Sequence, residues 1–322
     1  MKSSLAALAA GYCIDLIVGD PHGLPHPVIF IGKLISLCEK LLRKVFSAGK
    51  RGERAAGLVL WILVASVSTL VPWGLLKLLD RLHPLAAFGA ETLMCWQILA
   101  TRSLRDESMK VYLALQTGDL NASRKAVSMI VGRDTDRLDE QGVTRAAVET
   151  VAENTSDGIV APMVFLALGG APAGFFYKAV NTMDSMIGYI DPPYTHLGFV
   201  AAKMDDVMNY LPARLSALLM LAAGGFLGMN VNNGKKVFLR DRYNHASPNS
   251  AQTESVCAGL LGLQLAGDAW YGGVLHKKSF IGDPLRPIEA EDIPRACRLL
   301  YVTSFLSLLL CCGARLLLTV FL

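Results

Sequence analysis

One uninterrupted apolar stretch limits what this chain can fold into. Between residues 56 and 79 the only charged residue is Lys77, close to the end of the stretch. An α-helix needs about 20 apolar residues to cross the hydrocarbon core of a bilayer, so this stretch predicts a transmembrane helix. Hydrophobic residues make up 52% of the chain and charged residues 18%, and the mean hydropathy is +0.40, which is typical of a membrane protein. A formal net charge of only +4 argues against nucleic acid as a partner.

Other apolar segments are shorter or interrupted. They lie at residues 3–18, 84–100, 159–177, 216–229 and 299–322. The segment 159–177 is broken by the run GGAPAG, and 216–229 contains a Gly-Gly pair. Glycine and proline in such runs are typical of discontinuous or re-entrant membrane segments. In the last segment, Arg315 is expected to extend its charged end toward the membrane surface.

The strand signal is weak throughout, and a charged segment follows the first apolar ones. Residues 101–147 are polar, and Gly118 with Asp119 splits them into two expected helices. Asp134 or Thr135 is expected to cap the next helix. The sequence therefore predicts an all-α polytopic membrane protein with several transmembrane or re-entrant helices. It predicts one integral membrane domain over residues 1–322, with a water-facing helical insertion at 101–157.

An acidic helix lies at the centre of the chain, in the stretch VETVAENTSDGIVAPM. Glu149, Glu153 and Asp157 follow one another at intervals of four, which places them on one face of a helix. Gly158 is expected to end that helix. Three carboxylates beside an apolar segment are costly unless a cation, a metal or water offsets their charge. A solvated acidic helix face remains open as the simpler interpretation.

Further polar groups flank other apolar segments. They are Lys178, Asn181 and Asp184 in KAVNTMDSMIGY, Asp205 and Arg214 in KMDDVMNYLPAR, and Arg240, His245, Ser247 and Asn249 in RDRYNHASPNSAQTE. Ser247 fits an N-cap and Pro248 the first position of a helix running to about Leu265, whose N-terminus could take an anion. Carboxylates suit Mg²⁺ and basic groups suit phosphates, so the set predicts phosphoryl chemistry on a nucleotide. No Walker-type or kinase signature is present. Buried ion pairs, helix caps or a transport path lined by acidic residues remain alternatives.

The order of these motifs resembles the CobD/CbiB family, the adenosylcobinamide-phosphate synthases of cobalamin biosynthesis. The matching stretches are GDPHGLPHPVIFIGKLI, VGRDTDRLDEQGVTRAAVETVAENTSDGIVAPM, YKAVNTMDSMIGY, KMDDVMNYLPAR and RYNHASPNSAQTE. The resemblance implies a multi-pass enzyme of the bacterial inner membrane, a ligase that joins adenosylcobyric acid to 1-aminopropan-2-ol or its O-phosphate through an amide bond. It implies ATP as co-substrate, Mg²⁺ as cofactor, a lipid bilayer around the protein, and other membrane-bound enzymes of the late pathway as partners.

Within that resemblance, roles are assigned to three groups of residues. Expected metal ligands are Glu153, Asp157, Asp184 and Asp205. Expected nucleotide-binding residues are Lys178, Asn181, Arg214, Arg240, Ser247 and Asn249. Expected catalytic residues are Glu149, Glu153 and His245, with Glu149 or His245 accepting the proton of the amine.

Two other functions stay open. A prenyl or CDP-alcohol transferase also uses Mg²⁺ and acidic helices, but the paired DxxxD and DGxxAR patterns of those enzymes are missing. A transporter or a non-enzymatic membrane component of the corrinoid pathway is the other alternative. The basic residues between Lys40 and Arg54 predict a cytoplasmic end for the first long span. The stretches 178–214 and 240–254 are then expected on the cytoplasmic side with Glu153, since one ATP site cannot use groups on both sides of a membrane.

Overall fold

The computed structural model describes residues 2–21, 23, 25–189 and 192–321. Helices dominate the described residues, which confirms the predicted all-α class, and the few strands are two or three residues long. The chain divides into two compact units. Unit 1 comprises Met1–Leu99, Ala161–Asn209 and Cys311–Leu322, and unit 2 comprises Ala100–Val160 and Tyr210–Leu310. The polar segment 101–157 falls within unit 2, and its expected role as a water-facing insertion in a single membrane domain stays a prediction.

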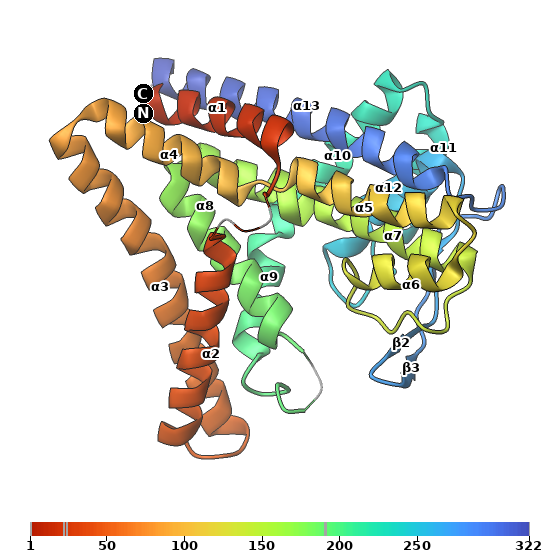
Figure 1. Ribbon diagram of the computed structural model, residues 1–322, viewed down its shortest axis with the longest axis horizontal. Coiled ribbons are helices and arrows are strands. Elements are labelled where there is room, and N and C mark those ends of the chain that lie inside the picture. Colours follow the sequence, from red (N-terminus) through yellow and green to blue (C-terminus); the bar gives the residue numbers. More distant parts are fainter. Residues whose placement is uncertain (1, 22, 24, 190–191, 322) are drawn as a thin grey trace. The chain divides into compact units, whose positions relative to one another are not determined.

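Unit 1 is built of helices joined by short connections. It contains α1 (Lys2–Val18), α2 (Pro27–Val45), α3 (Lys50–Leu82), α4 (Pro84–Ile98), α8 (Ala161–Ile187), α9 (Phe199–Met208) and the end of α13 (Asp292–Phe321). Helix α1 packs along α4, and α2 packs against α3 (Figure 1). Helices α2 and α4 begin alike. His26 and His83 each accept a hydrogen bond at Nδ1 from the N–H two residues on, at 3.3 and 3.2 Å, and proline takes the first helical position.

Several helices are long and apolar enough to cross a membrane. In the described part of the chain these are Lys50–Leu82, Glu140–Ile187 and Asp292–Leu317, and the pair Phe199–Met208 and Tyr210–Phe226 adds a fourth if it is counted as one span. The predicted span at 56–79 is confirmed within the 33-residue helix α3. Helix α4 forms as predicted, but its 15 residues reach only about 22 Å, short of a core of about 30 Å.

Helix α8 is broken where the sequence predicted. Gly169 and Gly170 leave helical geometry, and Gly170 has φ of 66° and ψ of −162°. The break frees the carbonyls of Leu166 and Ala167, which accept hydrogen bonds from Arg315 of α13 at 3.3 and 2.6 Å. The expectation that Arg315 extends to the membrane surface stays a prediction, and the structure gives its guanidinium a second role. Its guanidinium replaces the helical N–H groups that the break takes away.

Unit 2 is also mainly helical. It contains α5 (Thr101–Gln116), α6 (Leu120–Ser128), α7 (Glu140–Thr155), the π-helix η1 (Ser156–Val160), α10 (Tyr210–Phe226), α11 (Val231–Asp241), α12 (Ser250–Leu261) and the first part of α13. Two antiparallel strand pairs complete it. Strand β1 (Leu265–Ala266) pairs with β4 (Phe280–Ile281), and β2 (Ala269–Tyr271) pairs with β3 (Val274–His276).

Two predicted helix ends in unit 2 need correction. The predicted split at Gly118 and Asp119 is confirmed, and Asp119 caps α6 by accepting from Ala122 N–H at 3.0 Å. However, α7 is capped by Asp139 and not by Asp134 or Thr135. Asp134 instead accepts from the N–H groups of the turn between β2 and β3. Gly158 does not end a helix, because the chain widens into η1 there and continues into α8.

Helix α12 forms the centre of unit 2, and all twelve of its residues are buried. It begins at Ser250 with Asn249 as N-cap and ends at Leu261, so the predicted start at Ser247–Pro248 and end near Leu265 are both wrong. Gly259 lets α11 approach closely: a Cβ there would lie 2.7 Å from the carbonyl oxygen of Asn233. The Asn233 amide donates to the Gly259 carbonyl at 2.7 Å.

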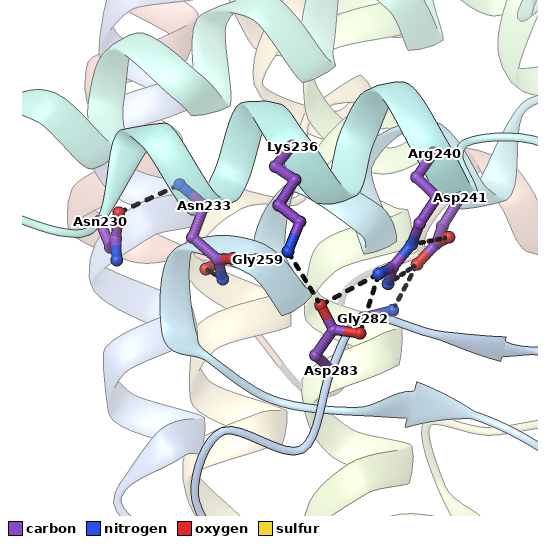
Figure 2. A network of polar contacts seen from close by, with 8 residues as sticks. All are labelled: Asn230, Asn233, Lys236, Arg240, Asp241, Gly259, Gly282 and Asp283. Carbon is purple, nitrogen blue, oxygen red and sulfur yellow. Dashed lines mark hydrogen bonds and ion pairs between the residues drawn. The ribbon is translucent and has the colours of Figure 1, made fainter.

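A network of polar contacts joins the end of α11 to the segment after β4 (Figure 2). Arg240 donates to both carboxylate oxygens of Asp241, at 2.7 and 2.8 Å, and to those of Asp283, at 2.9 and 3.0 Å. Asp241, which is buried, also accepts from Gly282 N–H at 2.8 Å. This network fixes the chain next to the candidate site described below.

Candidate active site

The deepest charged group of the predicted acidic helix is Glu149, which is 3% exposed. Its Oε2 accepts a hydrogen bond from Arg133, and its Oε1 accepts from Ala266 N–H at 2.6 Å. Burial alone would lower the pKa of Arg133, but the charge and the hydrogen bond of Glu149 outweigh it and raise that pKa. Both oxygens of Glu149 are thus used inside unit 2, in the manner of a structural ion pair.

Glu153 lies one turn further along α7 and is only half-buried. Its Oε1 accepts a hydrogen bond from Ser250 Oγ, at the start of α12, at 2.7 Å. Glu254 lies four residues after Ser250, on the same face of α12. It is 5% exposed, and its Oε2 has no hydrogen-bond partner. Burial raises the pKa of Glu254 well above its ordinary value, and the charges of Glu153 and Glu149 raise it further.

His245 completes this cluster from the loop before α12. Its Nδ1 accepts from Ser247 N–H at 3.0 Å. Burial lowers the pKa of His245, the nearby charge of Glu153 works against that shift, and Lys278 adds to it. A neutral imidazole at neutral pH can accept a proton, as the sequence analysis expected of this residue. Lys278 acts on both His245 and Glu254, and its ammonium group donates to the Tyr271 hydroxyl at 2.7 Å.

Asp157 does not continue the face of Glu149 and Glu153 in the predicted way. The α-helical spacing stops at Thr155, and Asp157 lies in η1, where hydrogen bonds run from i to i+5. Asp157 is half-buried. π-Helical turns inside longer helices are frequent at functional sites, so the position of Asp157 in η1 supports keeping it as a candidate site residue.

The predicted phosphate-binding residues of unit 2 divide into two sets. Arg214 donates to Asn249 Oδ1 at 3.3 Å and to the Tyr210 carbonyl at 2.6 Å, so two predicted residues do meet at the entrance to α12. Ser247 accepts from Asn249 N–H at 3.2 Å and closes a turn instead of capping the helix. Arg240 has its donors on Asp241 and Asp283, which is the ion-pair alternative left open for it.

The remaining predicted residues belong to unit 1. Lys178, Asn181 and Asp184 lie in α8, and Asp205 lies in α9. Asp205 is buried and accepts from Asn209 Nδ2 at 2.9 Å, while Asn209 accepts from the Tyr177 hydroxyl at 2.7 Å. The expected residues are therefore shared between the units, and the structure places Glu149, Glu153, His245, Arg214 and Asn249 in unit 2. In the residues that the structure describes, no three His, Cys, Asp or Glu side chains are grouped so that they could hold a metal ion.

Comparison with known proteins decides the family. A family model described as "CobD/Cbib protein" matches residues 8–300. The chain belongs to the CobD/CbiB family. The cobalamin biosynthesis protein CobD of Pelobacter propionicus is 48% identical to it over 297 residues, which is 92% of this chain and 91% of the relative. The protein of the same name from Photorhabdus laumondii is 45% identical over 315 residues, 98% of each chain. The cobalamin biosynthesis protein CbiB of Salmonella typhimurium is 45% identical over 312 residues, 97% of this chain and 98% of the relative. No solved structure matches the chain.

Three residues of the cluster in this CobD/CbiB chain were missed by the sequence analysis. Arg133 and Glu254 both stand in the stretches quoted for the family resemblance, and Glu254 has the helical spacing of four from Ser250 that would have placed it. Lys278 carried no such signal. It follows a short strand pair that the sequence pattern did not predict, and only the folded chain brings it to the cluster.

Proposed function

We propose that this chain is an ATP- and Mg²⁺-dependent ligase that joins adenosylcobyric acid to 1-aminopropan-2-ol or its O-phosphate in cobalamin biosynthesis. Membership of the CobD/CbiB family supports the pathway, as do relatives named cobalamin biosynthesis proteins. The observation that carries the chemistry is the cluster in unit 2, where Glu149, Glu153 and Glu254 lie with Arg133, His245 and Lys278.

The reaction requires activation of a carboxylate, which is a poor acyl donor at neutral pH. An oxygen of the corrin carboxylate attacks the γ-phosphorus of ATP, ADP leaves, and an acyl phosphate results. The amine nitrogen then attacks the acyl carbon, a C–N bond forms, the C–O bond to phosphate breaks, and the nitrogen loses a proton. Arg214, held near Asn249 at the entrance to α12, is positioned to offset phosphate charge. Neutral His245 can take the proton that the nitrogen releases.

The residues present fit Mg²⁺ in the mode that phosphoryl-transfer sites use. Mg²⁺ is usually held by one or two carboxylates together with substrate phosphates and water, and not by a cage of protein ligands. Glu153 and Asp157 are half-buried carboxylates at the end of α7 and in η1, so they can supply such a pair when ATP brings its own oxygens. Bound there, the ion would offset charge on the phosphates. Asp184 and Asp205 of unit 1 stay predicted ligands.

The proposed setting is the bacterial inner membrane with the site on the cytoplasmic side. The basic cluster around α3's start, including Lys50, Arg51 and Arg54, supports a cytoplasmic N-terminal end for this helix. ATP is cytoplasmic, so Glu153, the stretch 178–214 and the stretch 240–254 are assigned to that side.

The test is a reaction with purified protein in detergent, supplied with adenosylcobyric acid, ATP, Mg²⁺ and each amine in turn, with mass analysis of the corrinoid. The expected result is a product heavier by the amine minus one water, together with ADP. Glu153→Gln should lose most of this turnover, and Glu140→Gln, an exposed change on the same helix, should keep it. A protein that binds the corrinoid but forms no amide under any of these conditions would point to transport or another non-enzymatic role.

A further inference from the structure

Glu254 is the one acidic side chain of the cluster to which neither the contacts described above nor the proposed reaction assign a role. It lies in the second turn of the fully buried helix α12 and is 5% exposed. Its Oε2 lacks a hydrogen-bond partner, although the groups around it are polar. Leaving a buried carboxyl oxygen unpaired costs about 1–3 kcal/mol, and more when the group is charged. Such an oxygen either stays protonated or receives donors from a bound molecule.

The cations nearby already have other partners. Arg133 is paired with Glu149, which is also held by Ala266 N–H. The Lys278 ammonium donates to the Tyr271 hydroxyl. Two further carboxylates, Glu149 and Glu153, are close enough to act on Glu254. Glu254 Oε2 is therefore an unfilled acceptor among charged groups that already have partners, and a donor from a bound molecule would satisfy it.

An amino group suits Glu254 better than a metal ion. Glu254 lies in a fully buried helix, so a metal ion there would need several ligands from the protein itself, and the described residues offer no group of three that could hold one. An amino group can be satisfied by separate, single partners. Ser250 Oγ lies one turn before Glu254 along α12 and could accept a further donor.

We infer that Glu254 binds the primary amino group of the small amino alcohol and holds it in its neutral form. This inference rests on the proposed function for the identity of the amine. The ammonium ion R–NH₃⁺ releases one proton to water as it enters, and the complex holds R–NH₂ beside the Glu254 carboxylic acid. Burial favours this neutral pair over an ion pair, so the site delivers the amine in the form that can attack an acyl carbon. Glu149 is not available for this contact, because both of its oxygens are already bonded.

The test measures binding of the amine alone, in the absence of ATP and corrinoid. Titration calorimetry with the detergent-purified full chain should detect 1-aminopropan-2-ol, and propane-1,2-diol, its analogue without the nitrogen, should bind much more weakly. Glu254→Gln, which keeps the shape but removes the acidic O–H group, should weaken amine binding about tenfold to a hundredfold. ATP binding should be unchanged by Glu254→Gln, and Glu140→Gln should leave both affinities as they are. Unchanged amine affinity in Glu254→Gln, or equal binding of the diol by the unaltered chain, would overturn the inference.

A second measurement needs no variant, so it stands even if Glu254→Gln fails to fold. An apolar carbodiimide reacts with buried protonated carboxyl groups, and peptide mass analysis reports the labelling of Glu254. The amine should protect Glu254 and the diol should not; labelling that the amine leaves unchanged counts against the inference. Amide formation with an unaltered KM for the amine in Glu254→Gln would refute this inference alone. Absence of amide formation with intact protection by the amine would refute the ligase proposal and leave the site standing.

Discussion

Removing the carboxylate of Glu149 should destabilise unit 2 strongly, independently of any effect on turnover. In Glu149→Ala the guanidinium of Arg133, whose side chain is 19% exposed, loses its ion-pair partner, and Ala266 N–H loses its acceptor. Truncating one partner of a buried pair costs about 3–5 kcal/mol, and partial exposure of Arg133 favours the lower end. A loss of about 3 kcal/mol corresponds to a fall in melting temperature of roughly 6–12 °C.

The pair can be separated from its surroundings by a double-mutant cycle. Glu149→Gln retains an oxygen for Ala266 N–H but leaves Arg133 charged and unpaired. Adding Arg133→Gln removes the second charge, so the double variant should be more stable than the sum of the two single changes predicts, by about 2 kcal/mol. Glu140→Gln on the same helix is the exposed control and should change stability by less than about 1 kcal/mol.

The assay is unfolding in detergent without ligands, followed by intrinsic fluorescence, so that lost substrate binding does not enter the measurement. Additive costs in the cycle, or a Glu149→Ala protein as stable as the Glu140→Gln control, would refute the structural role. Turnover of folded Glu149→Gln, measured well below its melting temperature, then reports on chemistry alone. We expect it to retain more activity than Glu153→Gln.

Further changes test the pH dependence, the packing of unit 1 and the topology. The hydrogen bonds of Arg240 lower the pKa of Asp241 in spite of its burial, so this group stabilises the fold above its unfolded pKa of about 3.9 and loses that effect as the pH falls through the lower folded value. Asp241→Asn should therefore unfold more readily at pH 6 and show a smaller acid-induced decrease of its melting temperature; parallel curves would contradict this. Gly57→Ala should destabilise α3, because its Cβ would lie 2.1 Å from a carbonyl oxygen, whereas Gly74→Ala, with nothing within 4 Å, should not. Equal melting temperatures for these two variants would count against the close approach. Single cysteines at Thr195 and Asn244, without the native cysteines, should escape a membrane-impermeant thiol reagent added outside intact cells whose outer membrane has been permeabilised. Labelling of either would place that segment on the outer side.

The sequence predicted what depends on composition and local chemistry. The apolar run of α3, the break at Gly169–Gly170 and the split between α5 and α6 at Gly118–Asp119 all follow from residues next to one another in the chain. The grouping of Glu149, Glu153 and His245 was predicted through the family resemblance, and spacing along one helix supported the two carboxylates. A spacing of four residues no longer predicts which side chains share a face where an α-helix changes into a π-helix, as happens at Asp157 in η1.

What the sequence did not predict depends on contacts between distant segments. Arg133 lies 16 residues before its partner Glu149, in a turn whose side chains have no periodicity. Arg240 was predicted to bind phosphate, but its guanidinium donates to the adjacent Asp241 and to Asp283, which comes 43 residues later in a loop. Lys278 reaches its place through a pair of three-residue strands, which are too short to leave an alternating pattern. Each of these side chains has at least one partner far away in the sequence: Glu149 for Arg133, Asp283 for Arg240 and Glu254 for Lys278.

The contact between Arg315 and the break in α8 has a consequence for how the protein is made. The ribosome synthesises Leu166 and Ala167 almost 150 residues before Arg315, whose guanidinium donates hydrogen bonds to their carbonyls. Unpaired backbone groups are costly in hydrocarbon. Until the last helix has been translated, these carbonyls must therefore accept hydrogen bonds from water or from the insertion machinery. Otherwise α8 must stay outside the lipid. Helix α13 thus supplies the last hydrogen-bond donor that α8 needs. Chains truncated before residue 315 would reach the membrane without a partner from Arg315 for the carbonyls of Leu166 and Ala167.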